Sequence, residues 1–200
     1  MAELRSFIFL DRLQPQTMCY LGTWVRGALP RANVAAQIIE VSPGLDIEPI
    51  TDIALKHSGV GAGILLVERQ FGYLELHGPT SDVRSAADAV LEYLQVSAAT
   101  AIKPQVLASR VVSKIDRQHA FLINRNKIGS MAIPGESMYV MEMQPASYAI
   151  LAANEAEKAS RIKVVDYRMV GATGRVYLTG LESEVRAAAS AAEGAMKAVG

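Results

Sequence analysis

Residues 38–95 of this chain recur as residues 140–197 without a gap, so one sequence unit is used twice along most of its 200 residues. A constant offset of 102 positions (158 − 56) pairs Lys56 with Lys158 and Gly78 with Gly180. Such a duplication predicts two copies of one small fold. Two similar domains on one chain also favour closed, ring-like assembly, because a surface that fits one neighbour fits the next. The first hypothesis is therefore assembly rather than catalysis.

Composition narrows the classes of partner that this chain can have. Twenty Lys and Arg balance twenty Asp and Glu, which gives no electrostatic basis for binding nucleic acid or an anionic membrane. Cys19 is the only cysteine, so no disulfide framework or thiolate metal cluster can form. The first residues lack the pattern of a secretory signal, and no apolar run approaches the roughly 18 residues of a membrane span. We expect a soluble, cytoplasmic protein with neither a nucleic-acid nor a membrane partner.

The order of elements within a repeat follows from its apolar periodicity. The first repeat predicts a buried strand over 35–41, an amphipathic helix over 46–58, strands over 64–67 and 73–76, and a helix capped by Ser81. The second repeat is predicted to copy these elements at 137–143, 145–160, 163–167, 176–178 and 183–199. Each repeat is therefore read as strand, helix, strand, strand, helix.

One further strand is expected ahead of each repeat, at 6–12 and at 120–125. Both segments end in arginine, although their offset is 113 (125 − 12) instead of 102. A longer connection over 13–35, which contains Tyr20 and Trp24, would explain the difference.

The domain boundary is expected near residue 100. The linker over 96–105 contains Ser, Ala, Thr and Pro104. The predicted domains are therefore 1–98 and 104–200, and a helix over about 104–116 is expected to lead into the second repeat.

Three recurring features resemble the bacterial microcompartment (BMC) shell domain: Gly78 with its following helix, the lysine near the end of the first helix, and the Gly-containing turn between two strands. Members of that family have an α/β fold, which is an α+β sandwich of the ferredoxin-like type, and they assemble into flat sheets. No strand follows Val199, and a strand precedes each repeat instead, so the chain is similar to the circularly permuted, tandem-domain branch. Members of that branch form pseudohexameric trimers.

This resemblance implies a function and a set of partners. The chain would be a structural shell protein in a bacterial microcompartment of the cytoplasm, and a homotrimer would weigh 3 × 21.5 = 64.5 kDa. Its trimer would tile a facet beside other BMC shell proteins, hexamers and pentamers. A central, gated pore would pass small metabolites or cofactors, and no bound cofactor is expected.

The resemblance also places the predicted pore at two turns. The turn Glu68, Arg69, Gln70, Phe71 and Gly72 would face the central axis, and its Glu-Arg pair would act as the gate. Three copies of Arg69 would repel one another unless Glu68 neutralises them, so two loop states are expected. In the second repeat, the small residues of the matching turn permit backbone motion. That turn contains Met169, Val170, Gly171 and Ala172. Alternatively, Glu68 and Arg69 are an exposed ion pair contributing about 0–1 kcal/mol.

By the same resemblance, Lys56 and Lys158 would lie at the rim of the particle and contact the neighbouring trimer. Each ammonium can donate to carbonyl groups across that seam. The alternative is an ordinary helix-end cation that complements the helix dipole. Arg12 and Arg125 resemble the family's second edge residue.

No set of residues in this sequence predicts catalysis. His57, His77 and His119 lack metal-ligand spacing, Cys19 has no flanking motif, and the glycines of 59–63 lack the GxGxxG register. We therefore expect no enzyme activity, no catalytic residues, no metal site and no cofactor. The alternative function is a trimeric, ferredoxin-like sensor that binds a small molecule such as a nucleotide between subunits.

Overall fold

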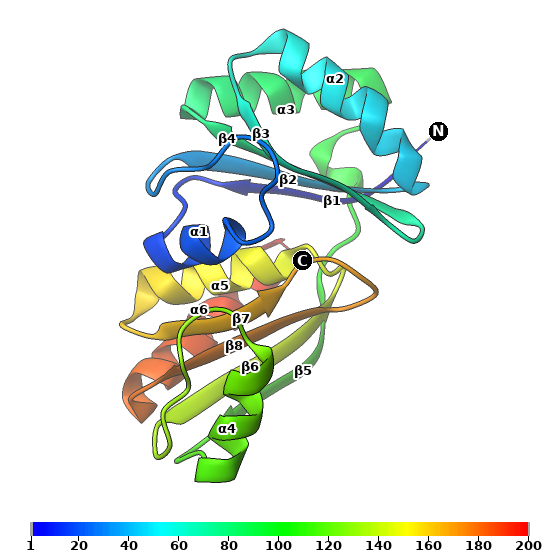
Figure 1. The fold of residues 1–200 in the computed structure, drawn as a ribbon. Coiled ribbons are helices and arrows are strands. Elements are labelled where there is room, and N and C mark those ends of the chain that lie inside the picture. The colour runs from blue at the N-terminus through cyan, green and yellow to red at the C-terminus, as the bar shows by residue number, and fades with distance from the viewer. Residues whose placement is uncertain (1, 200) are drawn as a thin grey trace. The chain divides into compact units, whose positions relative to one another are not determined.

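The computed structural model describes residues 2–199, which fold into two compact units that meet between Lys103 and Pro104 (Figure 1). Each unit contains one four-stranded antiparallel sheet. The strand order is β1-β2-β4-β3 in the first unit and β5-β6-β8-β7 in the second. The two sheets therefore have the same strand order, and in each the second strand of the unit lies between the first and the fourth.

In the first unit, two helices cover one face of the sheet and a short helix lies on the other face (Figure 1). The strands are β1 (Glu3–Leu10), β2 (Ala35–Ser42), β3 (Gly61–Glu68) and β4 (Phe71–Gly78). The helices are α1 (Pro15–Leu21), η1 (Gly44–Asp46), α2 (Ile47–His57), α3 (Thr80–Leu94) and η2 (Ala98–Thr100). The apolar face of α3, at Val83 and Val90, packs with Ile50 of α2 and Leu74 of β4 in one core.

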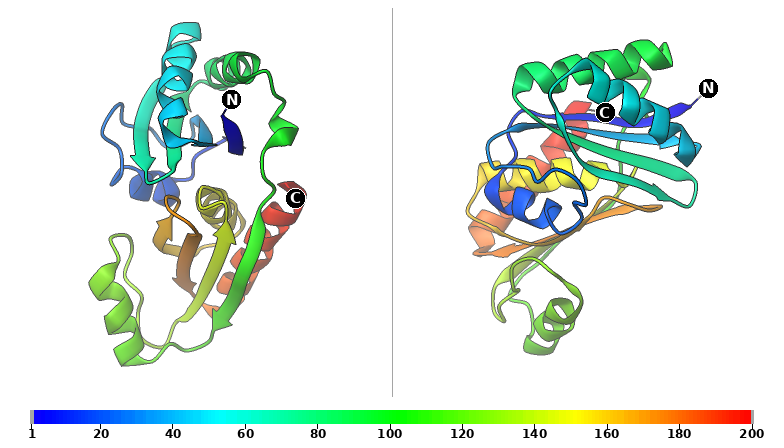
Figure 2. Two further views of the ribbon diagram at one scale, coloured as in Figure 1. Left: turned by 90° about the vertical axis from the view of Figure 1, so that its right-hand side faces the viewer. Right: turned by 45° about the horizontal axis from the view of Figure 1, so that its top comes forward.

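The second unit repeats this arrangement (Figure 2). Its strands are β5 (Gln105–Val112), β6 (Ser137–Gln144), β7 (Lys163–Arg168) and β8 (Gly174–Gly180). Its helices are α4 (Arg117–Asn126), α5 (Tyr148–Ala159) and α6 (Glu182–Val199). Met138 of β6 packs in a cluster with Ala120 and Ile123 of α4. Helices α5 and α6 pack on each other and on the strands of the same sheet.

The duplication extends further toward the N-terminus than the sequence comparison recognised. Strand β5 begins 102 positions after β1 (105 − 3), and α4 begins 102 positions after α1 (117 − 15). Even the connecting loops repeat: Leu13 N–H donates to Val34 O at 2.9 Å, and Ile115 N–H donates to Glu136 O at 2.7 Å. The connection over 13–35 is therefore matched by one of equal length in the second unit.

Two predicted elements at the start of the second unit are wrong. Residues 120–125, expected as a strand, lie within helix α4, and residues 105–112, expected as part of a helix, form strand β5. The side chain of Asp116 accepts a hydrogen bond from Gln118 N–H at 2.7 Å, so Asp116 caps the start of α4, where the sequence predicts the end of a helix. Only Ala120 and Ile123 of α4 are buried, which is the i, i+3 spacing of a helix.

Smaller differences concern the ends of elements. Ser81 lies inside α3, which begins at Thr80, and its hydroxyl donates to Asp82 Oδ1 at 3.1 Å instead of capping the helix. Helix α5 begins at Tyr148, three residues later than expected. Within residues 2–199, no helix combines the length and the apolar character needed to cross a membrane.

Gly72 at the start of β4 provides a test of how closely the chain packs beside η1. A Cβ there would lie 2.2 Å from Gly44 O and 2.7 Å from Ile47 Cβ. We therefore expect Gly72→Ala to lower the free energy of unfolding by about 1–3 kcal/mol, the usual cost of overpacking. Gly194→Ala is the control, because a Cβ at Gly194 in α6 meets nothing within 4 Å and should stabilise the helix by up to about 1 kcal/mol. Denaturant unfolding measures both, and equal stability of Gly72→Ala and the wild type would contradict the close packing.

Candidate functional site

The β3–β4 turn has a two-residue tip, shorter than predicted. Glu68 ends β3 and pairs with Phe71, which begins β4, so only Arg69 and Gln70 lie outside the strands. Arg69 has φ 56°, the left-handed conformation that tight hairpins need. Its side chain is 89% exposed, and its Nε lies 3.9 Å from Glu68 Oε1. This is a loose, solvated ion pair, which leaves both side chains able to reorient.

The base of the same turn is held by charged and aromatic contacts. The Arg5 guanidinium lies over the Phe71 ring, 3.9 Å from its centroid. Arg5 Nε also donates to Glu40 Oε1 at 2.7 Å, and the side chain of Glu40 is completely buried. The turn therefore combines an exposed ionic tip with a fixed base on β1 and β2.

The corresponding turn of the second unit has different chemistry. Gly171 occupies the position of Arg69 (171 − 69 = 102) and also has positive φ, 119°. Val170 and Ala172 replace Glu68 and Gln70, so the tip carries no charge. Met169 is buried.

The base of this second turn is tied down by a different set of bonds. Thr173 Oγ1 donates to Glu142 Oε1 at 2.7 Å, and Arg175 Nε donates to the same oxygen at 3.2 Å. The hydrogen bond from Thr173 is the main cause that lowers the pKa of Glu142, and the bond from Arg175 lowers it further. Glu142 stands at the position of Glu40 (142 − 40 = 102), so equivalent carboxylates fix both turns through different partners.

The two predicted edge lysines occupy the last turns of α2 and α5. Lys56 forms an ion pair with Asp52, and its side chain is 68% exposed. Lys158 Nζ lies 2.8 Å from Glu155 Oε1, and its side chain is only 23% exposed. Each ammonium group is therefore paired with a carboxylate of its own helix, and the side chain of Lys158 is the more buried of the two.

The predicted second pair of edge residues does not occupy equivalent positions. Arg12 follows β1 as an exposed residue, whereas Arg125 lies in the last turn of α4. The structural counterpart of Arg12 is Lys114 (114 − 12 = 102), which follows β5 and which the sequence analysis missed. The constant offset of the repeat was the signal that could have found it.

Two buried acids were also missed. Lys127 Nζ lies 2.9 Å from Asp166 Oδ2, and His77 Nδ1 lies 2.9 Å from Glu75 Oε1. Burial raises the pKa of both carboxyl groups. Among residues 2–199, no group of three or more His, Cys, Asp or Glu side chains is arranged to hold a metal ion.

Comparison with known families and proteins covers both units. Residues 4–100 match the CsoS1D N-terminal domain, and residues 137–200 match the BMC domain. The chain is 42% identical over 196 residues to the carboxysome shell protein CcmP of Synechococcus elongatus, covering 98% of this chain and 92% of that protein. It is 43% identical over 199 residues to the carboxysome shell protein CsoS1D of Hydrogenovibrio crunogenus, covering 98% and 97%.

Solved structures resemble the whole chain. A fused permuted hexameric shell protein from the RMM microcompartment is 70% identical, with a TM-score of 0.97 over 98% of both chains. A double ringed trimeric shell protein from the RMM microcompartment is 40% identical, with a TM-score of 0.96 over 100% of this chain and 98% of that one.

The Arg5–Glu40 pair below the first turn yields a stability prediction. Arg5→Leu, which installs the residue found at the same place in the second unit, leaves the buried Glu40 carboxylate without its cation. We expect a loss of roughly 3–5 kcal/mol in the free energy of unfolding, measured with denaturant. Adding Glu40→Gln should recover part of that loss because the amide carries no charge. Equal stability of the single and double variants would show that Arg5 acts through the Phe71 ring alone.

Proposed function

Because the chain belongs to the bacterial microcompartment (BMC) shell-protein family, we propose that three copies close a ring whose β3–β4 turns line a gated central pore. The predicted fold class, two tandem permuted BMC domains, is confirmed, and the protein is a structural component of a microcompartment shell. The alternative sensor function has no such support. The observation that carries the pore proposal is the exposed Glu68–Arg69 tip on a fixed base.

The charges of the tip supply the energy difference needed for a gate. Three Arg69 side chains around one axis repel one another, and each has a carboxylate of Glu68 within 3.9 Å of its Nε in the same turn. Pairing each arginine with a neighbouring copy's glutamate closes the pore, and pairing within one turn draws the charges away from the axis. Both arrangements keep the same number of exposed ion pairs, so their energies are close.

The second turn completes the lining without adding charge. Val170, Gly171 and Ala172 are small or apolar, so the tip of the second turn adds no charge to the lining. Small metabolites are the proposed cargo, because a ring of exposed side chains selects by size and charge.

The rim of the proposed trimer contacts other shell particles through lysine. Lys56 and Lys158 end equivalent helices, and the partners we propose are other BMC shell proteins, hexamers and pentamers among them. Arg12 and its counterpart Lys114 are proposed to lie beside these lysines. Arg125 keeps only the predicted role of an edge cation, from helix α4.

Arg69→Ala tests the gate. Removing the exposed guanidinium should change the conductance and the anion preference of reconstituted layers while the thermal midpoint of the assembly stays close to that of the wild type, since exposed pairs contribute about 0–1 kcal/mol. Gln70→Ala, at the neighbouring uncharged tip position, is the matched control and should leave anion preference unchanged. A marked loss of stability in Arg69→Ala would reassign Arg69 to a structural role.

Lys56→Asp combined with Lys158→Asp tests the edge. The double charge reversal should preserve the discrete particle, measured by light scattering, and abolish extended sheets in electron micrographs, because the ammonium donors at the seam are lost. Lys197→Asp, a charge reversal on the exposed end of α6, should still form sheets. Sheets that persist in the double variant would refute the edge role.

A further inference from the structure

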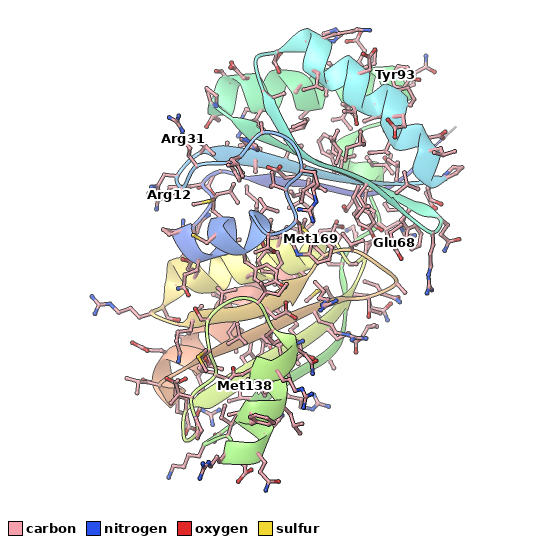
Figure 3. The ribbon with its side chains drawn as sticks, viewed as in Figure 1. Arg12, Arg31, Glu68, Tyr93, Met138 and Met169 are labelled. Carbon is pink, nitrogen blue, oxygen red and sulfur yellow. The ribbon has the colours of Figure 1, made fainter. Side chains whose placement is uncertain are left out.

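A cavity of about 510 Å³ opens in the first unit at the end of β3 and β4 farthest from the tip of their turn. Arg31, Gly61, His77 and Thr80 are among its lining residues. Gly61 and His77 are direct partners across the two strands, seven positions along β3 from Glu68, which is about 23 Å of strand. Figure 3 shows Arg31 and Glu68 at opposite ends of this unit. The cavity is therefore separate from the proposed pore.

His77 is held in a fixed orientation at the wall of this cavity. Its side chain is 8% exposed, and its Nδ1 lies 2.9 Å from Oε1 of Glu75, whose side chain is 1% exposed. Because Nδ1 is occupied by the Glu75 carboxyl group, Nε2 is the ring nitrogen left for a ligand. A Cβ at Gly61 would lie 2.9 Å from Nε2, so glycine at this position keeps that nitrogen accessible.

Arg31 and the start of α3 supply further donors to the cavity, and the side chains of Asn33 and Thr80 can both donate and accept. Arg31 is exposed and has no hydrogen bond or ion pair within the part of the chain that the structure describes. Thr80 begins α3, a helix of 15 residues whose N-cap, Pro79, makes no side-chain cap bond. Asp82 N–H donates to Pro79 O at 3.0 Å, so the N–H groups of Thr80 and Ser81 are the ones that remain for a ligand. The acid of that first turn, Asp82, accepts from Ser81, and its Oδ2 lies near Gly59.

The second unit contains a cavity at the corresponding place, and its lining residues differ from those of the first. Its volume is about 330 Å³, and its lining includes Gly135, Ser137 and Gly180, which are 102 positions after Asn33, Ala35 and Gly78 of the first cavity.

The residues that define the first cavity are not repeated in the second unit. Lys163 stands at the position of Gly61, and its Nζ lies 2.7 Å from Glu136 Oε2. Thr179 and Ile133 replace His77 and Arg31. The second cavity is therefore lined by Glu136 and Glu182 together with Lys114, whereas Arg31 is the charged residue that lines the first cavity beside His77.

We propose that the first-unit cavity binds the carboxylate or phosphate group of a small metabolite through Arg31, His77 Nε2 and the first backbone N–H groups of α3. Guanidinium and backbone N–H groups donate and do not accept, and a histidine Nε2 can carry a proton, so together they favour a ligand rich in acceptor oxygens. The volume falls within the usual range for small-molecule sites. This site does not depend on the pore, since none of its residues lies in the turn.

Histidine-selective NMR of the full-length protein tests the proposal near pH 6.5, with inorganic phosphate, acetate and chloride titrated at constant ionic strength. The chain has three histidines, so His57 and His119 serve as internal references. We expect saturable shifts of His77 alone, with phosphate or acetate and not with chloride. The probe of lower Kd identifies which group, phosphate or carboxylate, the site prefers.

Two variants and a matched control complete the experiment. Arg31→Gln should raise the Kd at least about tenfold, because a hydrogen bond to a charged group is lost. Gly61→Ala should do the same by covering Nε2. Arg26→Gln is the control, since Arg26 lies in the same loop, donates to the carbonyls of Thr23 and Val25, and does not line the cavity.

Four outcomes would overturn the site. They are equal shifts of all three histidines, an equal response to chloride, no saturable shift of His77 with either oxyanion, and an unchanged Kd in Arg31→Gln. Reference shifts of His57 and His119 that match those of the wild type establish that each variant is folded.

Discussion

The burial of one sheet face beneath a pair of helices is the interaction on which the rest of each unit depends. In the first unit, Ile39, Leu74 and Val90 share one core, and this packing fixes the register of the strands. Once the register is fixed, the ends of β3 and β4 are fixed as well. The exposed tip and the cavity therefore occupy the two ends of one hairpin, outside the core, where side chains can change without altering the fold.

The two units show how far such change has gone. Their strands, helices and even loop hydrogen bonds repeat at 102 positions, yet the chemistry at matched places differs. Arg69 is matched by Gly171, and Gly61 is matched by Lys163. Backbone geometry is retained because it depends on the buried apolar face, whereas charge at the ends of strands is not constrained by that face. Differences between the copies are therefore where function should be sought, and both proposals rest on such differences.

The sequence predicted the repeated order of elements because apolar periodicity and glycine positions are local signals. The prediction is wrong at 105–112 and 120–125, because it ends a helix at Asp116, whereas Asp116 begins one. That error misaligned Arg12 with Arg125 and hid Lys114. The contact of Arg5 with Phe71 and the exposure of His77 Nε2 beside Gly61 could not be predicted either. Both depend on cross-strand register, which joins residues distant in the sequence.

Fusion of two domains gives the proposed ring a freedom that six identical domains lack. In a ring of identical copies, every turn around the axis must carry the same residues, so six arginines would meet at the centre. A fused chain alternates a charged tip with a neutral one, which halves the number of like charges around the axis and leaves space for each Glu68–Arg69 pair to reorient. The same divergence gives only the first repeat a cavity lined by Arg31 and His77. Divergence of the repeats thus lowers the symmetry from six-fold to three-fold, and this lower symmetry makes a switchable tip physically feasible.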